Sequence, residues 1–188
     1  MLFRALTLAL LIATSASAQQ RRPAPAQPMT LTTSAWKDGG MIPPKHAQPG
    51  DDVSPPLSWD RVPEGTESFA LVMRDLDAIN INGADMHLYW MLWNIPKDAR
   101  SVAEKLPELE ELPDGTRQIS MSGPWYRGPA APPLGPVHHY AFELYALNAK
   151  LDIPAVGQSP AATEAAVRAA MVGKILGKAT LIGLFKRG

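Results

Sequence analysis

The sequence predicts a mainly β protein, an antiparallel β-sandwich with a C-terminal helix and short peripheral helices. Short runs of strand-forming residues follow one another, turns rich in glycine and proline separate them, and one late stretch has the composition of a helix. The chain has 188 residues, of which 46% are hydrophobic, and this size indicates one globular domain.

The first 18 residues have the pattern of a cleavable signal peptide. Arg4 supplies the positive start, Ala5–Ala13 is an apolar run too short to cross a bilayer, and Ala16–Ala18 is a cleavage site of small residues. We therefore expect cleavage after Ala18, a periplasmic or secreted location, and no stable membrane insertion. Residues 19–28 then form a leader rich in Gln, Pro and Arg, and residues 29–188 form a single domain.

Four segments in the first half of this domain predict strands. Leu31–Ala35 is rich in threonine, and Val53–Trp59 is expected at a sheet edge because its prolines have no N–H to donate. Ser68–Asp75 and His87–Pro96 are apolar runs that predict buried strands. Alternation in the second of these runs places His87, Tyr89, Met91 and Trp93 on one face.

The second half contains one charged excursion, one helix and a last strand. Lys97–Arg117 is acidic and broken by prolines, which favours a solvated excursion over an acidic binding surface. Ser159 can cap a helix that begins at Pro160 and continues to Val172, because proline suits the first helical turn and the run is rich in alanine. Lys178–Phe185 predicts the last strand.

The segment Gly123–Leu147 joins a loop rich in glycine and proline to a strand that begins at His138. Alternation places His138 and Tyr140 on the same strand face as the apolar Phe142 and Leu144. A polar pair at the end of a strand, with apolar residues deeper on the same face, is typical of a small pocket. An imidazole and a phenol are suitable donors to an oxyanion, and we expect a free N–H on Gly128 as a third donor.

Four ordered segments carry a family resemblance, namely Asp51–Trp59, Met73–Ala78 followed by Trp90–Pro96, Gly128–Pro129 followed by His138–Tyr140 and Glu143–Leu147, and Leu176–Gly183. Together they resemble the phosphatidylethanolamine-binding protein (PEBP) family, and most closely its bacterial Raf-kinase-inhibitor-like (YbhB/YbcL-type) branch. The resemblance covers Met29 to Arg187. It implies a PEBP-like sandwich with a small anion pocket at one edge, which binds phosphate or a phosphorylated head group.

The resemblance also implies a set of ligand-binding residues. Asp75 and Asp77 match the two aspartates of the family's Asp-Pro-Asp-Ala-Pro segment. Gly128–Pro129 matches the loop that closes the pocket, and His138 with Tyr140 matches the His-x-Tyr pair.

The sequence departs from the family pattern in three respects. Leu76 and Ile79 replace the two prolines of the aspartate segment, and Ala130 stands where many bacterial members have cysteine. Tyr89 occupies the position of the pocket histidine of the preceding strand. The further donor is therefore either Tyr89 or His87, which lies two residues earlier.

Asp75 has three possible roles beside an anion. It can hold the second ring nitrogen of His138 and keep the ring charged, it can stay protonated and donate to the ligand, or it can cap loop N–H groups at the strand end. His46, His87 and His138 have no zinc-ligand spacing, so we expect no metal and no other cofactor.

Composition and motifs narrow the functional class. Lys plus Arg and Asp plus Glu each number 18, so no overall charge attracts nucleic acid. The sequence contains no nucleophile elbow, Walker loop or dinucleotide fingerprint, which favours a binding protein over an enzyme. We expect an exported monomer or homodimer that binds a small anion, namely phosphate, a phosphomonoester or a phospholipid head group such as phosphorylethanolamine. The alternative is an interaction module that inhibits a protease or other enzyme through its loops, and a minor alternative is a hydrolase in which a carboxylate and a histidine activate water.

Overall fold

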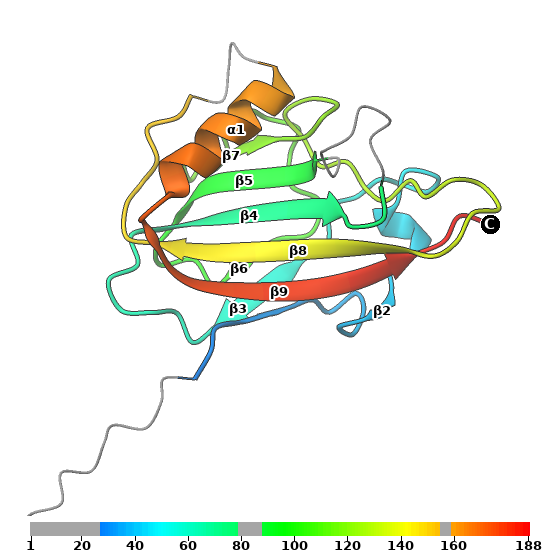
Figure 1. Ribbon diagram of the computed structural model, residues 1–188, viewed down its shortest axis with the longest axis horizontal. Coiled ribbons are helices and arrows are strands. Elements are labelled where there is room, and N and C mark those ends of the chain that lie inside the picture. Colours follow the sequence, from blue (N-terminus) through cyan, green and yellow to red (C-terminus); the bar gives the residue numbers. More distant parts are fainter. Residues whose placement is uncertain (1–26, 79–87, 155–158) are drawn as a thin grey trace, which may run out of the picture.

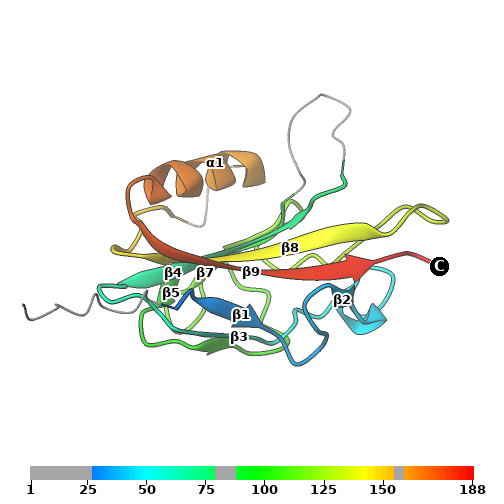
Figure 2. The ribbon, with the colours of Figure 1, turned by 60° about the horizontal axis from the view of Figure 1, so that its bottom comes forward.

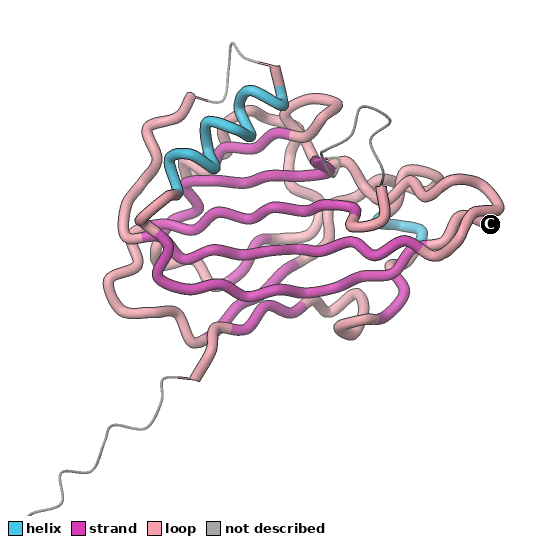
Figure 3. Tube along the Cα trace, in the orientation of Figure 1, coloured by secondary structure: helices cyan, strands magenta, loops and turns pink. Residues whose placement is uncertain are grey.

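The computed structural model describes residues 27–78, 88–154 and 159–188, and strands make up most of their regular structure (Figure 1, Figure 3). The signal peptide, residues 19–26 of the leader, Ile79 and His87 lie outside the described residues. A three-stranded sheet has the order β1-β3-β6, with strands Thr30–Thr32, Leu57–Asp60 and Ser101–Val102. A six-stranded sheet has the order β2-β9-β8-β4-β5-β7. Its strands in chain order are β2 (Gly40–Met41), β4 (Ser68–Asp75), β5 (Leu88–Pro96), β7 (Arg117–Ile119), β8 (His138–Leu147) and β9 (Ile175–Phe185).

The large sheet is covered on both faces (Figure 2). The small sheet packs on one face over an aromatic core that includes Trp59, Phe69 and Phe142. Helix α1 (Pro160–Met171) packs on the other face, where Val167 and Met171 meet the inner residues of β4 and β5. A 3-10 turn, η1 (Pro44–His46), completes the helical structure of the described residues. The predicted β-rich sandwich with one late helix is confirmed, and the helix forms a third layer.

The two strands that carry the predicted site have the predicted bounds. β4 is Ser68–Asp75 and β8 is His138–Leu147, and they pair antiparallel with Asp75 opposite Tyr140. This register brings the end of one strand against the start of the other.

The helix follows its predicted end signals. Ser159 caps it, with Oγ accepting the N–H of Ala162 at 3.3 Å, and Gly173 follows it at a positive φ of 73°. The last strand is longer than predicted, because it begins at Ile175 rather than Lys178.

The segment Val53–Trp59 is not a sheet edge. The strand itself begins at Leu57, after both prolines, and β3 lies between β1 and β6. The missing proline donors therefore restrict only the loop before the strand.

The predicted face of β5 is also wrong. The register between β4 and β5 shifts at Tyr89, since Met73 lies opposite Trp90 whereas Arg74 lies opposite Leu88. This irregularity puts Tyr89 in the core between the sheets, while Met91 and Trp93 pack toward α1. A bulge re-aims a side chain in this way, and simple alternation does not foresee it.

A candidate anion site at the ends of β4 and β8

The centre of the site is a buried pair formed by Asp75 and His138. Asp75 Oδ2 lies 2.7 Å from His138 Nδ1, and the two residues are 1% and 8% exposed. Asp75 Oδ1 accepts the backbone N–H groups of Asp77 at 2.9 Å and Ala78 at 3.1 Å. Asp75 therefore both holds the histidine ring and caps the turn that follows β4, which combines two of the roles expected for it.

Two tyrosines lie beside this pair. Tyr140 follows His138 on the same strand face, with the ring centroids 6.5 Å apart, and it is fully buried. Tyr89 meets Tyr140 edge to face, with the centroids 5.2 Å apart. The bulge in β5 directs Tyr89 toward the site. Tyr89, which stands where the family has a pocket histidine, therefore lies next to Tyr140.

The electrostatic environment keeps both phenols protonated. Burial raises the pKa of Tyr89, and the negative charge of Asp75 raises it further. Burial also raises the pKa of Tyr140, with Tyr89 and Asp75 adding to the rise. Both hydroxyl groups therefore carry a proton at neutral pH and can donate a hydrogen bond.

The expected free N–H of Gly128 is not free. It donates to Asp52 Oδ1 at 2.6 Å, and the Gly128 carbonyl accepts from Gln48 Nε2 at 2.8 Å. Glycine is needed here because a Cβ would lie 2.3 Å from the carbonyl oxygen of His46. Gly128 therefore fixes the path of the loop rather than presenting a donor to a ligand.

The rest of this loop is tied to both of its neighbours. The carbonyl of Pro129 accepts the N–H of Gln48 at 3.0 Å, and the N–H of Ala130 donates to the Tyr140 hydroxyl at 3.3 Å. The loop thus ends against the tyrosine of the candidate site.

Asp77 belongs to the outer side of β8 rather than to the buried pair. Its Oδ2 accepts from the backbone N–H of His139 at 2.6 Å and lies 2.9 Å from His139 Nδ1. Those contacts lower the pKa of Asp77, and the backbone N–H of His139 is the largest cause. Asp77 contributes to the site through its own N–H, which binds Asp75.

Sequence reasoning missed two residues that shape the site. Arg127 donates its N–H to the Tyr89 carbonyl at 3.1 Å, and its guanidinium lies 3.4 Å from Asp52. Asp52 in turn holds Gly128. The consecutive acids Asp51 and Asp52 before the Ser-Pro-Pro segment were the available signal, but their spacing from the loop at 128 gives no indication of contact.

Comparisons with known proteins agree with this architecture. The family model described as phosphatidylethanolamine-binding protein matches residues 32–186. A "UPF0098 protein" of Methanothermobacter thermautotrophicus is 43% identical over 162 residues, which cover 85% of this chain and 100% of the relative. A Mycobacterium tuberculosis protein described as lipoprotein LppC is 32% identical over 167 residues, which cover 87% of this chain and 76% of the relative.

A solved structure has the same fold. The crystal structure of Escherichia coli YbcL, described as a member of the mammalian PEBP family, superposes with a TM-score of 0.73 at 24% identity, and the match covers 86% of this chain and 100% of YbcL. The family model spans nearly the whole described domain, and the relatives cover it at more than 30% identity. The chain therefore belongs to the phosphatidylethanolamine-binding protein family.

Proposed function

We propose that this protein binds a small phosphorylated anion, namely phosphate, a phosphomonoester or a phospholipid head group such as phosphorylethanolamine. The observation that carries the proposal is the buried contact of 2.7 Å between Asp75 and His138, with two protonated tyrosines beside it. Family membership supports a general binding role, and the family's name supports a phosphorylated ligand.

The pair fixes which nitrogen of the histidine faces a ligand. All three contacts of Asp75 use its oxygens as acceptors, so the carboxylate favours a proton on His138 Nδ1. Among the described residues, Nε2 has no hydrogen-bond partner. In the protonated ring, Nε2–H donates a charge-assisted hydrogen bond to a phosphate oxygen, while Asp75 stabilises the positive charge from behind.

The groups of the site support a binding role. His138 and the hydroxyl groups of Tyr89 and Tyr140 supply donors, and Asp75 has no contact with a serine, threonine or lysine among the described residues that could make a nucleophile. A binding protein that is not an enzyme accounts for this set of groups.

Export is the second part of the proposal. The pattern of residues 1–18 supports it, and so does a relative described as a lipoprotein. Within the residues that the structure describes, no helix is long and apolar enough to cross a membrane.

Calorimetric titration with phosphate and with phosphorylethanolamine, at pH 6 and at pH 8, tests the ligand. Phosphate gains negative charge across this range because its second pKa is about 6, so a site of constant charge would bind it more tightly at pH 8. Weaker binding at pH 8 would indicate a histidine donor, because histidine is the side chain whose charge ordinarily changes between pH 5 and pH 8.

His138→Ala is the decisive variant and His139→Ala its matched control. The two histidines are neighbours on β8 but point to opposite faces. We expect His138→Ala to weaken binding by about tenfold or more, as for the loss of a charge-assisted hydrogen bond, and His139→Ala to keep most of the affinity. Equal losses in the two variants, or no binding to the wild-type protein, would contradict the proposal and favour the interaction-module alternative.

A further inference from the structure

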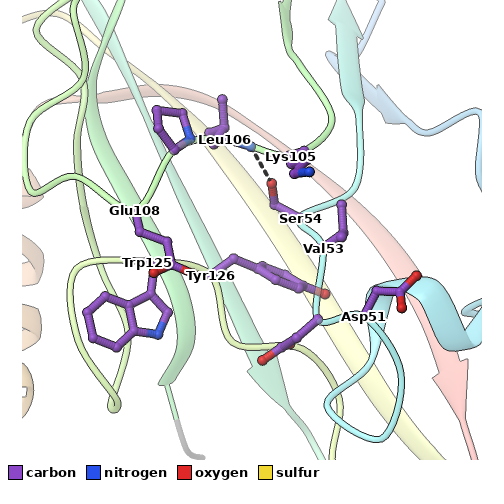
Figure 4. A pocket seen from close by; sticks show the side chains of 10 residues that line it. Asp51, Val53, Ser54, Lys105, Leu106, Glu108, Trp125 and Tyr126 are labelled. Atoms are coloured by element: carbon purple, nitrogen blue, oxygen red, sulfur yellow. Dashed lines mark hydrogen bonds between the residues drawn. The ribbon is translucent and has the colours of Figure 1, made fainter.

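A pocket lies next to the chain segment that leads to Gly128, since Trp125 and Tyr126 line it. Its volume is about 440 Å³, and three separate stretches of chain line it, at residues 51–54, 105–108 and 125–126 (Figure 4). The sequence pattern predicted that the middle stretch, part of the excursion Lys97–Arg117, is a solvated surface. Most of the excursion is exposed in the structure, and residues 105–108 also form one wall of this pocket.

The two walls are joined by fixed backbone contacts. The hydroxyl of the buried Ser54 accepts the N–H of Leu106 at 2.9 Å, and the Ser54 carbonyl accepts the N–H of Lys105 at 3.0 Å. On the third wall, Tyr126 is buried and its hydroxyl donates to the carbonyl of His46 at 2.7 Å. These hydrogen bonds fix the positions of the chain segments that line the pocket.

The lining carries an excess of negative charge. It contains the carboxylates of Asp51, Asp52 and Glu108 but a single ammonium group, that of Lys105. Asp52 is occupied by Gly128 and Arg127. Asp51 and Glu108 have no ion-pair partner among the residues that the structure describes, so their charges are available to a ligand.

The carboxylates act on one another across the pocket. Burial raises the pKa of Asp52, and the charge of Glu108 raises it further, against the opposing effect of Gly128 and Arg127. Like charges held at one site repel, and a cation placed between them relieves the repulsion. Lys105 does not do so from within the site, because it lies on the far side of the pocket from Glu108 and Trp125 (Figure 4).

Trp125 supplies an aromatic wall beside Glu108 (Figure 4). Its ring packs against the backbone at Gly123, where a Cβ would lie 2.2 Å from the indole. The absence of a side chain at Gly123 therefore fixes the position of the ring. Val53, Leu106 and Pro107 add apolar surface. Indole faces attract cations, and apolar walls accept the carbon stem that carries a cation.

We infer that this pocket binds an organic cation, an ammonium or guanidinium group on an aliphatic stem. The ligand is either a free amine or the side chain of a lysine or arginine in a polypeptide, which present the same chemistry. Glu108 pairs with the charge where Trp125 packs on the stem or the cation, and Asp51 adds its negative charge from the opposite side of the pocket (Figure 4). This site is distinct from the proposed anion site. Asp52 connects the two, because it lines the pocket and also accepts the N–H of Gly128 in the loop of the anion site.

Fluorescence and calorimetric titration of the purified protein test this inference. The other four tryptophans, at positions 36, 59, 90 and 93, are at most 8% exposed, so a change in emission on binding reports on Trp125. The probes are agmatine, as the free cation, and a capped Gly-Lys-Gly peptide, as the polypeptide source. Sodium chloride at equal ionic strength and butanol are the controls for screening and for apolar binding.

We expect saturable binding of at least one cationic probe and of neither control. Glu108→Gln and Asp51→Asn should each weaken it by about threefold to fivefold, the range for loss of an exposed ion pair. Glu110→Gln is the matched control, since it removes the same charge from the same exposed loop outside the pocket lining. His138→Ala should leave cation binding unchanged, which separates this inference from the proposed anion site.

Three results would overturn it. These are no saturable binding of either cation, equal weakening by Glu110→Gln and Glu108→Gln, and retention of full affinity in Trp125→Ala together with Glu108→Gln. Binding of agmatine alone would identify a small amine as the ligand class, and binding of the peptide would identify a basic side chain.

Discussion

Strand β8 carries a histidine–aspartate pair on each of its two faces, and the pairs differ in burial rather than in geometry. His138 meets Asp75 at 2.7 Å, and His139 meets Asp77 at 2.9 Å. The side chains of the inner pair are 11% and 2% exposed, whereas those of the outer pair are 52% and 40% exposed. The two histidines are adjacent on β8, and the two aspartates lie at the end of β4 and in the turn that follows it, yet the two pairs have different dielectric surroundings.

The comparison teaches that the pairing alone says little about function. Water screens the outer pair and can replace either partner, so its contact adds little stability. The inner pair has no such substitute, because Asp75 also satisfies two backbone N–H groups and lies under Tyr140. Losing Asp75 leaves the buried His138 without its partner and removes the acceptor of two backbone N–H groups.

The largest expected difference between the faces is in stability. Asp75→Ala should lower the free energy of unfolding by about 3 kcal/mol, since it leaves an unpaired histidine and two orphaned N–H groups. Asp77→Ala should lower it by less than about 1 kcal/mol. Urea denaturation at pH 7 measures both values, and similar losses would show that burial does not separate the two pairs.

A smaller difference should appear at the tyrosines of the same strand. Tyr140→Phe removes the buried acceptor of the Ala130 N–H and should cost about 1 kcal/mol. Tyr145 lies on the opposite face, where its hydroxyl donates to Glu143 at 3.1 Å and is partly accessible to water. Tyr145→Phe should therefore cost no more than about 0.5 kcal/mol.

Phosphate titration extends this second comparison. Tyr140→Phe should also weaken the binding of phosphate, whereas Tyr145→Phe should leave it unchanged. An equal effect of the two variants on binding would place the ligand away from the inner face of β8.

The smallest expected effect is on how the free energy of unfolding changes at acidic pH. The folded protein lowers the pKa of Asp77, so this carboxylate adds stability above its unfolded pKa and loses the increment as the pH falls through the lowered value. Asp77→Asn should thus lie slightly below the wild type in stability at neutral pH, and the gap should close in acid.

Carbon-detected NMR titration of the Asp77 carboxyl group checks the cause. His139→Ala should raise its pKa only in part, because the largest contribution comes from the backbone N–H of His139, which the variant keeps. Complete return to the usual range would assign the effect to the imidazole instead.

The strands of the site could be predicted because their residues repeat with a period of two. Ser68–Asp75 and His138–Leu147 have alternating or continuous apolar patterns with clear breaks at both ends, and tertiary packing did not alter them. The contact between Asp75 and His138 was one of the three roles expected for Asp75.

What sequence could not predict depends on contacts between distant segments. The bulge that aims Tyr89 arises from a register shift against β4, which no property of the β5 sequence announces. The N–H of Gly128 was expected to be free because its acceptor, Asp52, lies 76 positions earlier. The acidic pocket has the same origin, since its three walls come from separate stretches of chain.

The place of β9 in the large sheet sets the order in which the fold can be completed. This last strand lies inside the sheet, paired antiparallel with β8 and parallel with β2, so that Gly40 lies opposite Gly183. While the chain emerges from the ribosome, the 10 residues of β8 have no partner on that side, and they form an unpaired edge that other chains can join. The nascent protein therefore cannot close its sheet until residues 175–185 are synthesised, and until then it depends on being kept apart from its own copies.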